Sequence, residues 1–262
     1  MRTIAIMNQK GGVGKTTTSV NLSAALAAAG QRTQLIDLDP QSHASLHLGL
    51  TFESEFDSVY DVLVKDAELA SVRRHIEDNL WLAPAHLDLA AADFELASVL
   101  GREKILADKI AEDTEEFDYT IIDCPPSLGV LTLNALVAAE EVIIPLEPHF
   151  LALHGLSKLL ETVELVGRRL NSKLRVSGVV FCIYDGHTGL AKAVSEDVKN
   201  FFQKNTKRPE AWDSVVVFET KIRRNIKLAE APSFGCSIFE YDPKSNGAAD
   251  YLALAQEVLK MK

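Results

Sequence analysis

A glycine-rich segment near the start of the chain restricts the fold more than any other feature. Residues 10–17, Lys-Gly-Gly-Val-Gly-Lys-Thr-Thr, lie between an apolar run at residues 3–8, typical of a buried strand, and a helical pattern over residues 16–29. A strand, a glycine-rich turn and a helix in this order form a phosphate cradle, because backbone N–H groups and the positive end of the helix dipole converge there. We therefore expect an α/β fold with this cradle at the edge of a sheet.

Individual residues of the cradle fit the binding of ATP. Gly11, Gly12 and Gly14 let the backbone approach the ligand and adopt positive φ. The Lys15 ammonium can reach the β- and γ-phosphates, and the Thr16 hydroxyl can ligate Mg²⁺. The residues expected from this pattern to contact ATP are Gly11, Gly12, Val13, Gly14, Lys15, Thr16 and Thr17.

Apolar β-rich runs alternate with helical patterns along the whole chain. Several runs are nearly continuous Ile, Val and Leu, which is typical of strands buried on both faces of a parallel sheet. Strands are expected at residues 3–8, 33–37, 80–83, 119–123, 141–146, 175–182 and 214–218. Helices are expected at residues 16–29, 89–112, 128–138, 153–170, 190–204, 224–230 and 247–261. The alternation predicts a doubly wound three-layer sandwich with a mostly parallel sheet, a P-loop NTPase fold, as one domain over residues 1–262.

Composition narrows the functional classes further. No apolar stretch approaches the roughly 18–20 residues that a membrane span needs. Three widely spaced cysteines without metal-ligand spacing favour a reduced, cytoplasmic protein. The formal net charge is −10, yet residues 156–227 hold 14 Lys and Arg against 8 Asp and Glu. The chain can therefore present a basic face to nucleic acid although it is acidic overall.

Two of the expected strands end in aspartates. Asp37 and Asp39 follow one apolar run and Asp123 ends another, which places their carboxylates at the edge where ligands bind in such folds. Asp123 fits the role of holding Mg²⁺ through a water molecule, and the expected magnesium set is Thr16, Asp39 and Asp123. Asp37 is expected to be structural. A lone aspartate at a strand end often caps the next element, so this pattern leaves Asp39 between capping and catalysis.

One departure from the common phosphate-loop pattern points to a family. The pattern GxxxxGK[ST] places glycine five positions before Gly14, where this chain has Gln9, and a second lysine, Lys10, follows. Residues 9–18 resemble the deviant Walker A motif of the ParA/MinD ATPases. Further segments are similar to ParA/Soj-type partition ATPases: Asp39-Pro40-Gln41, Asp123-Cys124-Pro125-Pro126, Asn134-Ala135-Leu136 and Leu228-Ala229-Glu230-Ala231-Pro232.

The resemblance implies an ATP-hydrolysing switch that uses ATP and Mg²⁺. It implies that Lys10 crosses a dimer interface and contacts the nucleotide of the partner subunit, so Lys10 joins the expected ATP-contacting residues. An added cation near the scissile phosphate would stabilise developing charge. Lys10, Lys15 and Asp39 are thus the expected catalytic residues, with Asp39 orienting or deprotonating the attacking water. The expected active form is a homodimer in the ATP state.

The resemblance also implies non-specific DNA binding by that dimer. Residues 220–227 match a segment that carries a DNA-binding arginine, here Arg224, and Lys221, Arg223 and Lys227 would add phosphate contacts. Two positions depart from the family: Arg223 stands where proline near the adenine is usual, and His187 replaces an arginine implicated in DNA binding. A ParB-like centromere-binding partner is implied, with a chromosome or plasmid as cargo and nucleoid association in the ATP state.

Other members of the superfamily supply the alternatives. A MinD-like membrane ATPase ends in a basic amphipathic helix, whereas residues 251–260 have few basic residues and are expected to pack on the sheet, so no membrane is expected. A relative of the nitrogenase iron protein would need two cysteines for a cluster, and Cys124 lacks a suitably placed partner. A small-molecule ATP-dependent ligase or kinase stays open. The scattered histidines, His43 among them, are expected to be ordinary.

Overall fold

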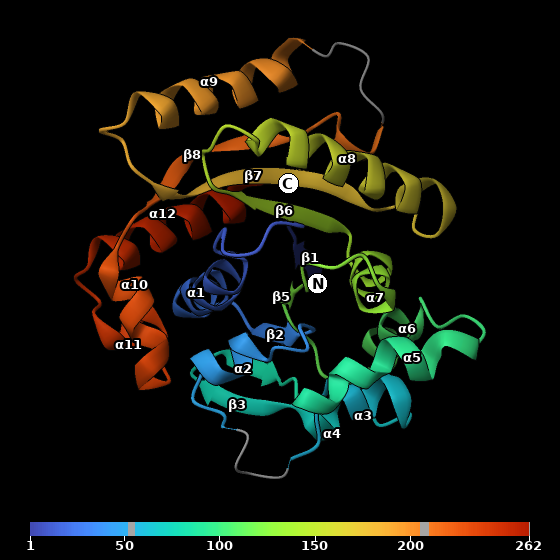
Figure 1. Ribbon diagram of the computed structural model, residues 1–262. Coiled ribbons are helices and arrows are strands. Elements are labelled where there is room, and N and C mark those ends of the chain that lie inside the picture. The colour runs from blue at the N-terminus through green and yellow to red at the C-terminus, as the bar shows by residue number, and fades with distance from the viewer. Residues whose placement is uncertain (52–55, 205–209, 262) are drawn as a thin grey trace.

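The computed structural model describes residues 1–51, 56–204 and 210–261, and Figure 1 shows helices on both sides of a central sheet. The eight strands lie in the order β3-β4-β2-β5-β1-β6-β7-β8. Their bounds are β1 Arg2–Ile6, β2 Thr33–Asp37, β3 Arg74–Glu77, β4 Leu80–Ala83, β5 Tyr119–Asp123, β6 Glu141–Leu146, β7 Arg175–Tyr184 and β8 Val216–Arg223. Every neighbouring pair is parallel except β3 with β4. The expected doubly wound, mostly parallel fold is confirmed.

Two helical layers bury the two faces of the sheet. One face is covered by α1 (Lys15–Ala28), α2 (His43–His47), α10 (Ile226–Glu230), α11 (Ile238–Tyr241) and α12 (Asn246–Lys260). The other face is covered by α3 (Val59–Val64), α4 (Leu69–Val72), α5 (Ala92–Glu95), α6 (Ile105–Glu112), α7 (Val130–Ala138), α8 (Ala152–Arg169) and α9 (Gly189–Lys204). Short 3₁₀ turns are η1 (Leu87–Ala91), η2 (Leu96–Ser98), η3 (Glu210–Trp212) and η4 (Ala231–Phe234).

The central strands are apolar without interruption because both faces are buried. In β1, Ile4 and Ile6 enter the core beneath α1, whereas Ala5 enters the core on the opposite face. Successive side chains of a strand point to opposite faces, so a strand covered on both sides needs apolar residues at every position. This pattern allowed β2, β4, β5 and β6 to be predicted with the bounds they have in the structure.

Three expectations about elements were wrong. The strand β3 was not predicted, because Arg74-His75-Ile76-Glu77 is a polar, largely exposed edge segment. The helix expected over residues 89–112 is instead a series of short turns followed by α6, and the break contains Gly101 in the left-handed region (φ 72°). The last strand was expected at residues 214–218 and the next helix at residues 224–230, whereas β8 spans Val216–Arg223 and α10 begins at Ile226.

The last helix packs inward, as its sequence predicted. Tyr251, Leu254 and Val258 of α12 are buried in the same core as α1 and β8. None of the described helices combines the length and apolar character that crossing a membrane requires. Because α12 touches both α1 and β8, it connects two elements that border the pocket described next.

Candidate active site

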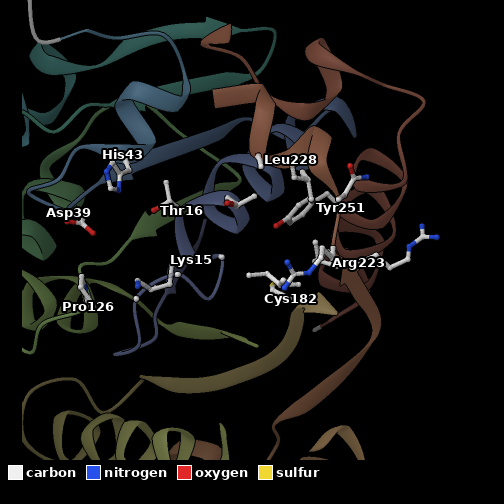
Figure 2. Close-up of a pocket in the computed structure, with 18 of the residues that line it drawn as sticks. Lys15, Thr16, Asp39, His43, Pro126, Cys182, Arg223, Leu228 and Tyr251 are labelled. Carbon is white, nitrogen blue, oxygen red and sulfur yellow. The ribbon is translucent and has the colours of Figure 1, made fainter. Parts of the chain in front are cut away.

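A pocket of about 550 Å³ opens at the carboxyl edge of the parallel strands. In Figure 2, Asp39, His43 and Pro126 lie on one side of this pocket and Arg223 and Tyr251 lie on the other. The glycine-rich segment forms its floor with Gly11, Gly12, Gly14, Lys15, Thr16 and Thr17. The glycine-rich segment and Asp39, both expected at this edge of the sheet from the sequence, thus line one pocket.

The glycine-rich turn has a backbone that other residues could not adopt without strain. Gly12 and Gly14 have φ values of 74° and 92°, and Gly14 directly precedes α1. A Cβ at Gly14 would lie 3.3 Å from the Cβ of Cys182, so the space is tight as well. The first turn of α1 keeps backbone N–H groups without intrahelical partners. The Lys15 ammonium lies 3.3 Å from the Lys10 carbonyl oxygen. Together, this ammonium and the backbone N–H groups form a site suited to a polyphosphate.

The end of β5 provides a carboxylate that is short of a partner. Asp123 is fully buried, and its Oδ1 accepts a hydrogen bond of 2.8 Å from the Ser19 hydroxyl. Burial raises the pKa of Asp123 and the charge of Asp37 raises it further, while the hydroxyls of Ser19 and Thr16 oppose that rise. Oδ2 makes no hydrogen bond of ordinary geometry with any described residue. A buried carboxylate oxygen beside Thr16 fits a Mg²⁺ ion held partly by nucleotide phosphates.

Asp123→Asn is expected to remove the magnesium dependence of nucleotide binding. An amide keeps the shape and the Ser19 contact but supplies no negative charge, so we expect at least about tenfold weaker Mg·ATP binding. Calorimetry with and without EDTA measures this, and the exposed Asp88→Asn serves as the control. If EDTA weakens ATP binding by the variant as strongly as by the unmodified protein, Asp123 does not hold the ion.

A buried aspartate shapes the loop that carries Asp39. The Asp37 carboxylate accepts hydrogen bonds from the Ser45 backbone N–H (2.8 Å), the Ser45 hydroxyl (2.7 Å) and the Asp39 N–H (3.2 Å). Burial raises the pKa of Asp37, and these donors oppose the rise. Asp39 itself accepts from the Gln41 N–H (3.0 Å) and lines the pocket. Asp37 therefore has the structural position expected of it, and Asp39 makes a local turn contact while also facing the site.

Several pocket residues were missed by the sequence analysis. His43, which was expected to be ordinary, lines the pocket beside Asp39. The other missed residues are Gln41, Pro126, Cys182, Ile183, Ile222, Asn225, Leu228, Ala229 and Tyr251. Cys182 could have been found, because it ends a predicted strand, whereas Asn225 follows β8, which runs beyond the strand expected at residues 214–218. Tyr251 lies within α12 and carries no such signal.

The second lysine of the glycine-rich segment lies outside the pocket that it borders. The Lys10 ammonium donates to Oε2 of Glu147 at 2.8 Å, and the Lys10 backbone N–H donates to Oδ1 of Asn8 at 2.9 Å. Glu147 directly follows β6 at the same edge of the sheet. Neither Lys10 nor the buried Val13 lines the pocket, so two of the residues expected to contact ATP do not face it within this chain.

The candidate DNA-binding residues gather at the end of β8 and just after it, and three of the four have partners inside the chain. The Lys221 ammonium lies 4.3 Å from the centre of the Tyr184 ring and 3.2 Å from its hydroxyl. Arg223 forms an ion pair of 2.6 Å with Asp250 of α12 and lines the pocket. Arg223 is thus placed at the nucleotide pocket rather than with a free basic surface.

The other two candidates lie just after β8. Lys227 pairs with Glu230 at 2.9 Å, an exposed contact of a kind that contributes little to stability. The exposed Arg224 guanidinium has no hydrogen-bond or ion-pair partner among the described residues. His187 is exposed in the turn between β7 and α9. Arg224 also lines the pocket, and among the four candidates its charge is the one without a partner in the described part of the chain.

Comparison with known proteins agrees with this geometry. A family model described as an AAA domain matches residues 1–176. The chain is 46% identical over 256 residues to the sporulation initiation inhibitor protein Soj of Bacillus subtilis, covering 97% of each chain. It is 44% identical to the chromosome partitioning protein ParA of Myxococcus xanthus, covering 99% of this chain and 88% of the relative.

Solved structures show the same architecture. A cobyrinic acid a,c-diamide synthase from Mycobacterium smegmatis with bound ADP and magnesium is 36% identical, with a TM-score of 0.83 over 99% of this chain and 94% of that one. Apo McdA from Cyanothece, at 23% identity and a TM-score of 0.83, shares the fold over 99% of both chains. The glycine-rich cradle, the aspartates at the strand ends and the end-to-end similarity agree: the chain is an ATPase that belongs to the ParA/Soj-type partition ATPases.

Proposed function

We propose that the protein is a switch that dimerises on ATP, binds DNA without sequence preference and drives chromosome or plasmid partition with a ParB-like partner. The observation that carries this proposal is the position of Lys10, which borders the nucleotide pocket yet extends away from it to Glu147. To reach the nucleotide of its own subunit, Lys10 would have to break its ion pair with Glu147 and turn into the pocket. Its position outside that pocket suits contact with the nucleotide of a second copy. The protein would act in the cytoplasm and associate with the nucleoid in its ATP state.

Within one subunit, the chain's own groups divide the work of ATP hydrolysis. The N–H groups of the cradle and Lys15 would bind the phosphates, and Thr16 and Asp123 would hold a Mg²⁺ ion. That ion would supply positive charge to the phosphates. Asp39 positions the attacking water and accepts its proton. The adenine base of ATP would lie at the opposite end of the pocket, where Ile222, Leu228 and Ala229 offer apolar contact.

Exposed apolar side chains around the pocket support a face that a second copy covers. Large apolar residues are more than half exposed just after each of five parallel strands: Leu87, Leu128, Phe150, Leu190 and Ile226, following β4, β5, β6, β7 and β8. Parallel strands end at one edge, so these side chains share the edge that carries the pocket and Lys10. A two-fold dimer that pairs this edge of both copies would bury these side chains.

Oligomeric state tests the proposed switch directly. Light scattering after size exclusion should give a monomer with ADP and a dimer with ATP for the hydrolysis-blocked variant Asp39→Ala. The nucleotide must be present in the running buffer, because a complex that depends on ligand dissociates when the ligand is removed. A monomer in both conditions would contradict the role proposed for Lys10.

Arg224→Ala is expected to weaken DNA binding. Its guanidinium has no partner in the described chain and would contact a phosphate. Loss of one such contact should lower affinity roughly threefold to tenfold and reduce the salt slope by about one. Fluorescence anisotropy of a labelled duplex at several salt concentrations, with ATPγS, gives both quantities. Arg74→Ala on β3, at the opposite edge of the sheet, is the matched control.

Two outcomes would count against the DNA-binding proposal. One is that the unmodified protein with ATPγS does not bind DNA at low salt. The other is that Arg74→Ala weakens binding as much as Arg224→Ala, since the loss would then reflect total charge rather than a surface near β8.

A second candidate function is ATP-dependent modification of a small molecule. It is favoured by the 36% identity to the structure of a cobyrinic acid a,c-diamide synthase. The 46% identity to Soj over almost the whole of both chains favours partition. Turnover stimulated by a carboxylic-acid metabolite, and unaffected by DNA with a ParB-like protein, would support the small-molecule enzyme instead.

A further inference from the structure

Two consecutive residues of α12 contact two elements that border the pocket, β8 and α1. Asp250 accepts hydrogen bonds from the Arg223 backbone N–H (3.0 Å) and from Nη2 of its guanidinium (2.6 Å), and Nε lies 3.0 and 3.1 Å from the two carboxylate oxygens. The Tyr251 hydroxyl lies 3.1 Å from the Thr18 hydroxyl of α1. Hydrogen bonds thus hold the end of β8 to α12, and α12 to α1, the helix that begins at the phosphate cradle.

The contact between Asp250 and Arg223 joins a buried group to a half-exposed one. The side chain of Asp250 is 10% exposed and that of Arg223 is 50% exposed. A half-exposed ion pair adds little to stability, but the bond from the backbone N–H fixes the main chain itself. Proline, which the family resemblance leads one to expect at position 223, has no N–H and could not make that bond.

The segment fastened in this way forms the end of the pocket farthest from Asp39. Ile222, Arg223, Arg224 and Asn225 line it with Leu228 and Ala229 of α10. Figure 2 shows Arg223 and Leu228 on the side opposite Asp39 and His43, with Lys15 and Thr16 between. Once phosphates occupy the cradle, the nucleoside must lie against this segment.

We propose that the Arg223–Asp250 pair is a positioning device for the nucleoside half of the site. It sets how tightly the base and ribose are held and leaves the binding and cleavage of the phosphates unchanged. The inference rests on the proposed ATPase function and adds a determinant of nucleotide affinity. Arg223 accordingly acts on the nucleotide pocket and is not a DNA-binding residue.

Two variants break the pair to different extents, and the chain offers a matched control. Asp250→Ala removes both the backbone and the side-chain contacts, whereas Arg223→Ala keeps the backbone N–H bonded to Asp250. Glu257 of α12 accepts the N–H groups of Glu219 (3.0 Å) and Thr220 (2.8 Å), a tether of the same kind that does not line the pocket. Glu257→Ala therefore loosens β8 from α12 away from the nucleotide.

The measurements are the KM and kcat for ATP and the inhibition constant of inorganic tripolyphosphate, which has no base. Asp250→Ala should raise KM about tenfold and Arg223→Ala about threefold, with kcat within about twofold of the unmodified protein. The inhibition constant of tripolyphosphate and all values for Glu257→Ala should be unchanged.

The proposal is overturned if the variants lose as much affinity for tripolyphosphate as for ATP, or if kcat falls while KM stays constant. It is also overturned if Glu257→Ala raises the KM for ATP as much as Asp250→Ala does. An unmodified protein that neither binds nor hydrolyses ATP would contradict the proposed function itself. That result is separate, because it does not depend on any variant of the pair.

Discussion

Asp39→Ala is expected to lower ATP turnover by at least about a hundredfold while ATP affinity stays within about threefold. Asp39 lines the pocket on the same side as His43 and Pro126, across from the nucleoside end. The substitution removes the carboxylate proposed to position the attacking water, so it should destabilise the transition state while the contacts to bound ATP stay in place. Single-turnover hydrolysis and calorimetric binding of ATP measure the two quantities separately.

A second substitution separates chemistry from loop structure. Oδ1 of Asp39 accepts the Gln41 N–H, so alanine also removes a turn contact. Asp39→Asn keeps an oxygen at that position and removes only the negative charge. Both variants should be inactive if Asp39 acts on water. An active Asp39→Asn, or a loss of ATP affinity equal to the loss of turnover, would make Asp39 a structural residue or a ligand instead.

Lys10→Ala is expected to reduce turnover on the order of a thousandfold, the range reported for cations that a second molecule supplies in phosphoryl transfer. The reason is that the ammonium would stabilise charge on the transferring phosphoryl group of the partner's nucleotide. The free chain should fold normally, because the only hydrogen bond or ion pair of the Lys10 side chain among the described residues is the exposed one with Glu147. The DNA-stimulated ATPase rate measures the effect, and thermal unfolding checks the fold.

Mixing two inactive variants tests whether Lys10 acts across the interface. In a heterodimer of Lys10→Ala with Asp39→Ala, one site would have its own Asp39 and a lysine from the partner. Random pairing should restore about a quarter of normal activity, since half the dimers are mixed and each has one intact site. The variants must be combined before ATP is added. If the mixture stays inactive while mixed dimers form, Lys10 acts within its own subunit.

The fold was largely predictable because the central strands are buried on both faces. Their uninterrupted apolar runs are easily recognised, and four strands had the predicted bounds. The polar edge strand β3 has no such pattern, since it pairs on one side and is exposed on the other. The single helix expected at residues 89–112 was wrong because helical periodicity in the sequence does not reveal where tertiary contacts end short turns. One such contact is the hydrogen bond from the Val130 N–H to Asp93.

The phosphate end of the site was also predictable, and the nucleoside end was not. Phosphate binding depends on consecutive residues, so the cradle is a continuous motif in the sequence. The opposite wall depends on Tyr251, which lines the pocket, and on Asp250, which binds Arg223; both are in place because α12 packs between α1 and β8. Arg223 was expected to contact DNA, although the family resemblance puts its position near the adenine, and in the structure it lines the pocket.

The order of the strands has a consequence for how the molecule meets a charged polymer. Residues 1–131 carry 10 basic against 21 acidic side chains, and residues 132–262 carry 17 against 16. The strands of the two halves lie apart, because β3, β4, β2, β5 and β1 lie to one side and β6, β7 and β8 to the other, although α11 and α12 of the second half contact α1 of the first. The molecule therefore has an electric dipole moment across the sheet. Near DNA, that dipole favours approach with the β8 edge leading, and added salt weakens the orienting torque.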